Sequence, residues 1–196
     1  MRVFLDFEAS SLAKRSYPIE VAWVFEDGRC ESHLIQPHPD WTDWDEEAEA
    51  IHGISRSQLA REGEPHDRVA LRMVEVLTGH DLFASAPSWD AKWLNALLRS
   101  VGFPKHQLRL GKTSEMIARE LGTLLGEAFS PEESREAVKA ILADTDPART
   151  GPPAHRALPD AQADRSRWLA AQGAAEALRQ AKAICRPGRR SADYPA

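Results

Sequence analysis

The first residues of the chain alternate between apolar and charged side chains, as expected for a strand. Val3, Leu5 and Phe7 fall on one face of this predicted strand, because successive side chains of a strand point to opposite faces. Asp6 and Glu8 fall together on the other face, about 6 to 7 Å apart along the strand. The pattern predicts a strand whose apolar run is interrupted by two neighbouring carboxylates.

Two further strands are predicted directly after the first. The runs at 20–25 and 30–35 are rich in apolar and β-branched residues. The dipeptide Asp27-Gly28 between them is a strong signal for a two-residue hairpin turn. The first part of the chain is therefore expected to form an antiparallel meander.

Helical periodicity dominates the rest of the chain, with capping residues, glycines and prolines at the ends of the periodic runs. We expect helices over about 44–51, 55–63, 65–77, 88–101, 114–125, 130–143 and 158–184. Short strands are predicted at 81–84 and 107–110. A strand meander followed by strands interleaved with helices predicts an α/β fold, with one mixed sheet covered by helices.

Composition limits the number of domains and the location of the protein. With 196 residues and 42% hydrophobic content, the chain is long enough for one well-buried domain. We expect a single domain over 1–185 and a flexible tail over 186–196. The cysteines Cys30 and Cys185 form no disulfide or zinc pattern, and a signal peptide or a membrane-spanning run is absent from the sequence. A cytoplasmic protein without a membrane partner is expected.

The net charge of −5 argues against a protein that coats long duplex nucleic acid, because such proteins usually carry a clear positive excess. A nuclease is not excluded by this charge. An enzyme that holds only the end of a strand can be acidic when bound divalent cations supply the positive charge.

Asp6 and Glu8 are the first candidate functional residues. Two anions side by side within an apolar strand cost desolvation and mutual repulsion unless a cation or hydrogen-bond donors compensate. The simpler interpretation of an isolated Asp-x-Glu is that both acids face water. A metal site is therefore only one interpretation until other ligands are found.

Two later segments offer such ligands. Asp90 falls in the first turn of a predicted helix, where the helix dipole alone favours an acid. Pro159 belongs near the start of the last helix, which places Asp160 in its first turn and His155 on the preceding loop. The simpler interpretation of the last pair is an exposed histidine followed by an acidic first turn.

Together these segments resemble the DEDDh family of 3′ to 5′ exonucleases, a group that includes proofreading subunits of bacterial DNA polymerases, ribonuclease T and oligoribonuclease. The matching segments are Phe4 to Glu8, Ser88-Trp89-Asp90 and His155 to Ala161. Ile51-His52-Gly53-Ile54 is similar to a segment that several members carry near the terminal nucleotide of the substrate. The resemblance implies a ribonuclease H-like fold.

The resemblance also implies a mechanism. Asp6, Glu8, Asp90 and Asp160 would hold two divalent ions, and carboxylate oxygens suit magnesium or manganese. His155 would act as the general base toward the attacking water. The expected activity is stepwise hydrolysis from the 3′ end of single-stranded DNA or RNA, or of short oligonucleotides, with release of nucleoside 5′-monophosphates.

Substrate contacts are implied less directly, because the sequence departs from the family pattern. Ser10 and Ser11 stand where many members have a hydroxyl residue and a glycine, and both are expected to donate hydrogen bonds. Leu12 is either an apolar wedge under the last base or a core residue. Trp89, which replaces a phenylalanine, either stacks on a base or is buried, and His52 either contacts substrate or is packed internally.

These departures leave a second function open, an inactive or weakly active domain that serves as a binding module in a polymerase or regulatory complex. Several members of the family are dimers, so a homodimer is included among the expectations. The choice between DNA and RNA cannot be made from these motifs. The basic residues considered as phosphate contacts, or equally as solvated surface, are Arg56, Arg61, Lys105, Arg109, Lys112, Arg165 and Arg167.

Overall fold

The computed structural model describes residues 1–146 and 155–184 of the chain. At its centre is a six-stranded sheet in the order β4-β3-β2-β1-β5-β6. Its strands are β1 (Arg2–Ala9), β2 (Pro18–Phe25), β3 (Cys30–Gln36), β4 (Glu64–Pro65), β5 (Asp81–Ala84) and β6 (Leu110–Lys112). The first three strands pair antiparallel, whereas β5 and β6 run parallel to β1. The predicted α/β fold, a mixed sheet with an antiparallel meander, is confirmed.

Seven helices surround this sheet in the described residues: α1 (Glu46–His52), α2 (Arg56–Glu62), α3 (His66–Leu77), α4 (Pro87–Ser100), α5 (Thr113–Gly126), α6 (Pro131–Asp144) and α7 (Ala157–Ile184). Each matches a predicted helix to within two residues at either end. Ser88 does not cap α4, because the helix already begins at Pro87, whose fixed φ suits the first helical position. The strand predicted over 107–110 lies at 110–112 instead.

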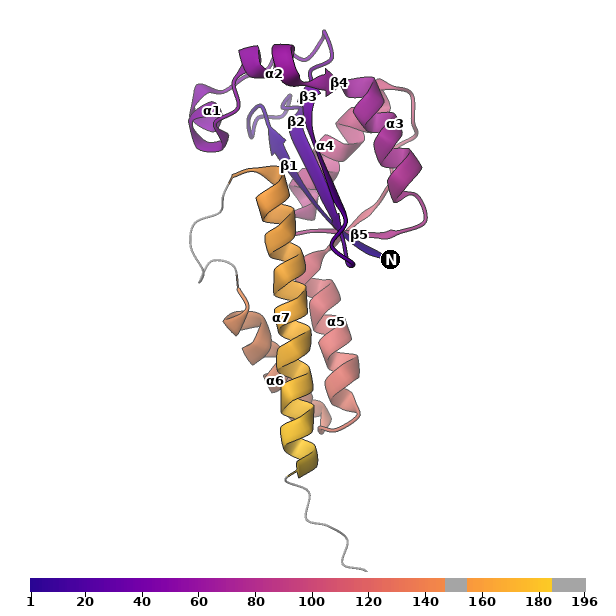
Figure 1. Ribbon diagram of the computed structural model, residues 1–196, viewed down its shortest axis with the longest axis vertical. Helices are drawn as coiled ribbons and strands as arrows, with labels where there is room; N and C mark the ends of the chain where they lie inside the picture. Colours follow the sequence, from indigo (N-terminus) through magenta and orange to yellow (C-terminus); the bar gives the residue numbers. More distant parts are fainter. Residues whose placement is uncertain (147–154, 185–196) are drawn as a thin grey trace, which may run out of the picture.

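The alternation predicted for the first strand divides the core into two layers. Val3, Leu5 and Phe7 are buried in a cluster with residues of α3 and α4. Phe4 is buried on the opposite face, in a cluster with residues of α5, α6 and α7. Figure 1 shows α7 running along the sheet and then continuing beyond it beside α5 and α6, while α3 and α4 lie on the other side.

The end of β1 pairs with a neighbouring strand on one side only. Pairing with β5 covers only Arg2 to Phe4, whereas pairing with β2 continues to Ala9. The second half of β1 is therefore free of a strand on its β5 side. The first turn of α4, which follows β5 after two residues, fills this position.

Some predictions from composition fall outside the part of the chain that the structure describes. The predicted tail at 186–196 and Cys185 lie in the segment that is not described, whereas Cys30 is a free, exposed cysteine. Within residues 1–146 and 155–184, no helix combines the length and apolarity needed to cross a bilayer.

The close approach of α2 to β3 provides a stability test. A Cβ atom added at Gly63 would lie 2.5 Å from the Leu59 carbonyl oxygen and 2.7 Å from the Gln36 backbone nitrogen. Gly63→Ala should therefore destabilise the protein by about 1 to 3 kcal/mol. Gly122, within α5, has open space around the same position, so Gly122→Ala should stabilise the protein by about 0.5 to 1 kcal/mol. Urea unfolding of both variants measures these changes in the free energy of unfolding. Equal changes in the two variants would contradict the close packing of Gly63 against β3.

Candidate active site

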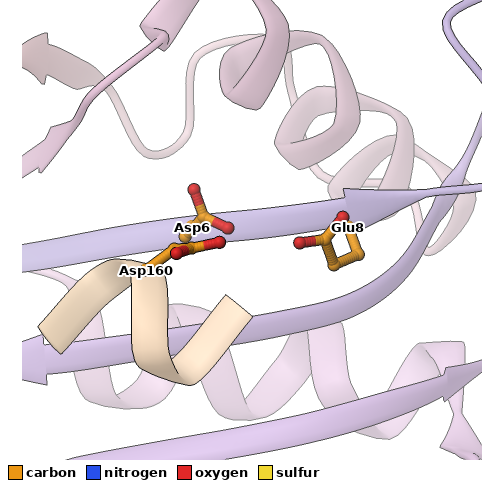
Figure 2. Close-up of side chains that lie close together, drawn as sticks. All are labelled: Asp6, Glu8 and Asp160. Carbon is orange, nitrogen blue, oxygen red and sulfur yellow. The ribbon is translucent and has the colours of Figure 1, made fainter. Parts of the chain in front are cut away.

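Three predicted carboxylates meet at the end of β1. Asp6, Glu8 and Asp160 are each partly buried, and one oxygen from each lies within 4.8 Å of those from the other two. Asp6 and Glu8 occupy the face of β1 that α7 covers, and Asp160 lies in the first turn of α7, as predicted from Pro159. Figure 2 shows the three side chains converging from the strand and the helix.

The fourth predicted carboxylate, Asp90, lies beside this group rather than within it. Asp90 sits in the first turn of α4 and is only 3% exposed. The Phe7 backbone lies close enough to lower the pKa of Asp90, which places this carboxyl against the half of β1 that β5 leaves uncovered. Its Oδ2 atom has no hydrogen-bond partner among the described residues. A buried oxygen without a donor is costly and points to a missing positive ligand.

Burial and mutual repulsion disfavour ionisation of these acids. Burial raises the pKa of Asp6 well above its usual value, and the charges of Asp90 and Glu8 raise it further. Burial, assisted by Asp160, raises the pKa of Glu8 to about 7. Burial, assisted by Asp164, raises the pKa of Asp90 to about 7. Each acid is therefore held in an environment that lacks sufficient positive charge to balance its ionised form.

A divalent cation fits this arrangement. The group offers only carboxylate oxygens, the donors that magnesium and manganese prefer, and Asp90 offers an unpartnered oxygen next to it. A bound cation would lower the raised pKa values of Asp6, Glu8 and Asp90 by attraction and would offset the repulsion among the carboxylates. The residues at the end of β1 therefore form a candidate divalent-metal site.

The loop that carries His155 is fixed by an ion pair between the partly exposed Arg156 and the buried Glu20. The Arg156 guanidinium donates two hydrogen bonds to Glu20, at 3.0 and 2.7 Å, and the Ala157 N–H donates a third at 2.9 Å. Glu20 is only 2% exposed on β2, so the first turn of α7 is tied to the sheet. His155 itself adopts a φ of 51°, which is uncommon for a residue other than glycine. The anchor holds His155 at the end of α7 that carries Asp160.

Glu20 and Asp164 are two buried acids that the sequence interpretation missed. Glu20 interrupts an apolar strand, the same signal that singled out Asp6. Asp164 lies one helical turn after Asp160, is 5% exposed and accepts a hydrogen bond of 2.6 Å from the Thr113 hydroxyl. Its spacing of four residues from Asp160 on α7 was the available signal. Burial raises the pKa of Asp164 as well.

The predicted substrate contacts at Ser10 and Ser11 are engaged within the protein. Both side chains are buried, and both hydroxyls donate to the carboxylate of Asp43, at 3.3 and 2.5 Å. The Ser10 hydroxyl oxygen also accepts a hydrogen bond from the Tyr17 N–H. These contacts order the loop that follows β1. A direct contact of either serine with substrate stays a prediction.

Leu12 and Trp89 are exposed beside that loop. Leu12 is 68% exposed, so the alternative of a core residue is wrong. Trp89 is 39% exposed and stacks on Trp93, with ring centroids 5.8 Å apart. The Lys92 ammonium lies 5.1 Å from the centre of the Trp89 ring and donates to the Ala13 carbonyl of the loop. Both exposed side chains remain available to a ligand.

His52 is packed internally, as one of its two predicted alternatives requires, and its contact with substrate stays a prediction. The ring is 5% exposed, and its Nδ1 atom accepts a hydrogen bond of 3.0 Å from the Ile54 N–H. Burial lowers the pKa of His52, so the neutral ring carries its proton on Nε2. This Nε2 has no acceptor among the described residues. His52 is thus packed as a core residue and also holds an unused donor.

Comparison with solved structures identifies the fold. E. coli exonuclease I in its zinc-bound complex with single-stranded DNA matches with a TM-score of 0.60 at 16% identity, over 93% of this chain and 41% of that chain. Exonuclease I from Methylocaldum szegediense matches with a TM-score of 0.59 at 17% identity, over 86% of this chain and 40% of that chain. An apo exonuclease I matches with a TM-score of 0.62 at 15% identity, over 92% of this chain and 43% of that chain.

The chain has the fold of exonuclease I. The predicted ribonuclease H-like fold is therefore confirmed. The chain spans less than half the length of these exonuclease I structures. No family model and no curated protein sequence matches the chain.

Asp6→Asn should stabilise the protein when metal is removed. The raised pKa of Asp6 means that its ionised form destabilises the metal-free fold, so replacement by a neutral amide should raise the melting midpoint by about 2 to 8 °C at pH 8. An acid with a raised pKa costs stability as the pH rises, so the difference from wild type should shrink toward pH 5. Thermal melts in EDTA at both pH values measure this difference.

The matched control for Asp6→Asn is Glu136→Gln, which neutralises an exposed acid of α6. It should change the midpoint by about 1 °C or less at either pH. Magnesium should raise the midpoint of wild type more at pH 8 than at pH 5. An Asp6→Asn variant that melts below wild type in EDTA at pH 8 would contradict the repulsion described above.

Glu20→Gln should loosen the start of α7. The amide cannot pair with the charge of Arg156, and we expect a loss of about 1 to 3 kcal/mol in the free energy of unfolding. Glu75→Gln removes the acid of an exposed pair with Arg72 and should cost less than about 0.5 kcal/mol. Urea unfolding compares the two. Equal losses would show that the Glu20 pair has no special structural role.

Proposed function

We propose that this protein is a metal-dependent 3′ to 5′ exonuclease that acts on single-stranded DNA. The observation that carries the proposal is the convergence of Asp6, Glu8 and Asp160, with the buried Asp90 beside them, at the end of the central strand. The exonuclease I fold supports the same conclusion. The proposed reaction releases nucleoside 5′-monophosphates one at a time.

Asp6, Glu8 and Asp160, together with Asp90, would hold the divalent cations. Their donor set suits two magnesium or manganese ions. When bound, such ions supply positive charge that stabilises the attacking and leaving oxygens of an in-line phosphoryl displacement. The four carboxylates alone would repel an anionic phosphate, so the site would accept the scissile phosphate only when the bound positive charge is present.

His155 is the proposed general base. It precedes the Arg156 anchor on the loop at the start of α7, at the end of the helix that carries Asp160. Its imidazole would accept the proton of the attacking water. The oxygen of that water would bond to phosphorus as the bond from phosphorus to the 3′ oxygen breaks, and the leaving 3′ oxygen would take up a proton from solvent water. The products are a nucleoside 5′-monophosphate and a strand with a new 3′-hydroxyl.

The remaining predicted residues would hold the terminal nucleotide. His52 presents a buried Nε2–H donor that the protein does not use among its described residues, and we assign it to a substrate oxygen. Leu12 and Trp89 would contact the terminal bases, since both are exposed and apolar. Ser10 and Ser11 would order the loop beneath Leu12 through Asp43, and their contact with substrate stays part of the proposal.

DNA is the proposed substrate because the similar structures include E. coli exonuclease I bound to single-stranded DNA and to a dT13 oligonucleotide. Rates on matched DNA and RNA strands test this preference. The predicted homodimer is not needed by the proposed mechanism, and light scattering of the purified protein tests it.

In the alternative function, a binding module without activity, the cluster of four carboxylates at the end of β1 would have no catalytic role. The raised pKa values of Glu8 and Asp90 argue against it, because a group without a cation would retain a cost to folding for no gain.

The activity test uses a 5′-labelled single strand with magnesium or manganese. Wild type should shorten the strand stepwise, and EDTA should stop the reaction. Asp6→Ala and Asp160→Asn should each lower the rate by about 10³-fold or more. Glu136→Gln should retain wild-type activity. Shortening that persists in EDTA, or in Asp6→Ala, would exclude the proposed mechanism.

A further inference from the structure

An open groove runs along α4, outside the carboxylate site. Its volume is about 680 Å³. The walls come from α4, from the segment after β3 and from the loop between α4 and β6. The residues used below are His38, Trp41, Lys92, Arg99, Lys105 and His106. None of them belongs to the proposed catalytic group.

The charge of the groove is opposite to that of the chain. Lys92, Arg99 and Lys105 carry positive charge, whereas Asp40 is the single carboxylate of the lining, and its side chain is 90% exposed to water. The whole chain has a net charge of −5. A cationic lining on an acidic protein indicates a surface suited to an anionic ligand.

One end of the groove lies next to the exposed Trp89 and the loop after β1, through Lys92. Lys92 lies two residues after Asp90 on α4, beside Trp89 and the loop that follows β1. Arg99 lies seven residues further, on the same face of the helix and about 10 Å along its axis. This distance corresponds to about three nucleotides of a stacked strand. The cations of α4 therefore form a line that leads away from the carboxylates.

The loop that closes the groove is held in a strained conformation. His106 has a φ of 65° and is one of two residues other than glycine with positive φ in the described residues. Its N–H donates a hydrogen bond of 3.0 Å to the Asn95 side chain, which in turn donates to the Ala91 carbonyl at 2.5 Å. Such strain persists only where surrounding contacts enforce it and is common at functional sites. Asn95 thus fixes this loop on α4.

An aromatic side chain completes the lining. Trp41 is partly buried and stacks on Tyr17, with ring centroids 5.4 Å apart. A positively charged groove with an aromatic platform is the combination that binds single strands without sequence preference, because cations contact the backbone and rings stack on bases.

We propose that this groove binds the backbone of single-stranded DNA on the 5′ side of the nucleotide being removed. Arg99 and Lys105 contact phosphates, and Trp41 supports a base. The inference rests on the proposed exonuclease activity and adds to it the path of the strand. Lys92 orders the loop near the active site and is therefore left unchanged in the test.

The test compares two double variants of equal charge. Arg99→Ala with Lys105→Ala removes the groove cations, whereas Arg135→Ala with Lys139→Ala removes two exposed cations of α6. Binding of a fluorescent single strand of about 15 nucleotides is followed by anisotropy in EDTA at several salt concentrations. The groove variant should bind the strand about tenfold more weakly. The slope of log K against log salt should become about 1.4 less steep, since each of the two lost phosphate contacts contributes about 0.7 to its magnitude.

Activity separates this inference from the proposed function. The p-nitrophenyl ester of thymidine 5′-monophosphate occupies only the catalytic site, so the ratio of kcat/KM on the long strand to kcat/KM on the ester should fall about tenfold in the groove variant. The α6 variant should keep the wild-type ratio and affinity. Equal affinities and salt slopes for the two double variants would overturn the inference. If wild type hydrolyses neither substrate but the two double variants still differ in affinity for the strand, the proposed function is contradicted. The assignment of the groove as a binding site for single-stranded DNA then still holds.

Discussion

Repulsion among buried carboxylates at the end of β1 is the constraint on which the site depends. Asp6 and Glu8 share one face of the strand, α7 brings Asp160 to that face, and α4 places Asp90 at the open edge. Burial raises the pKa of Asp6, Glu8 and Asp90. A fold that maintains this crowding is less stable than one that avoids it, and bound divalent cations offset the difference.

The rest of the fold holds the carboxylates in position despite this repulsion. Glu20 ties Arg156 and the first turn of α7 to β2, and Asp164 joins α7 to the first residue of α5 through Thr113. Apolar layers on both faces of β1 fix the strand between them. These contacts position the acids before any cation arrives, which is the preorganisation that metal-assisted phosphoryl transfer requires.

Much of the fold and of the carboxylate group could be predicted because the signals are local. Strand alternation placed Asp6 and Glu8 on one face, and Pro159 placed Asp160 in a first turn. The Glu20–Arg156 pair could not be predicted, because it joins residues 136 positions apart and exists only after the sheet and α7 pack. The position of β6 could not be predicted from the sequence either, since the bounds of a three-residue strand are determined by its pairing with β5. Ser88 lies inside α4 and does not cap it, because the fixed φ of Pro87 suits the first helical position.

The central claim is that the carboxylates at the end of β1 exist to bind divalent cations. Calorimetric titration of the metal-free protein with manganese at pH 8 tests it most directly, in parallel with Asp6→Asn and the exposed-acid variant Glu136→Gln. The account predicts saturable binding of two ions by wild type and Glu136→Gln, and loss of at least one of them in Asp6→Asn. Binding that is absent from wild type, or unchanged by Asp6→Asn, would contradict the account.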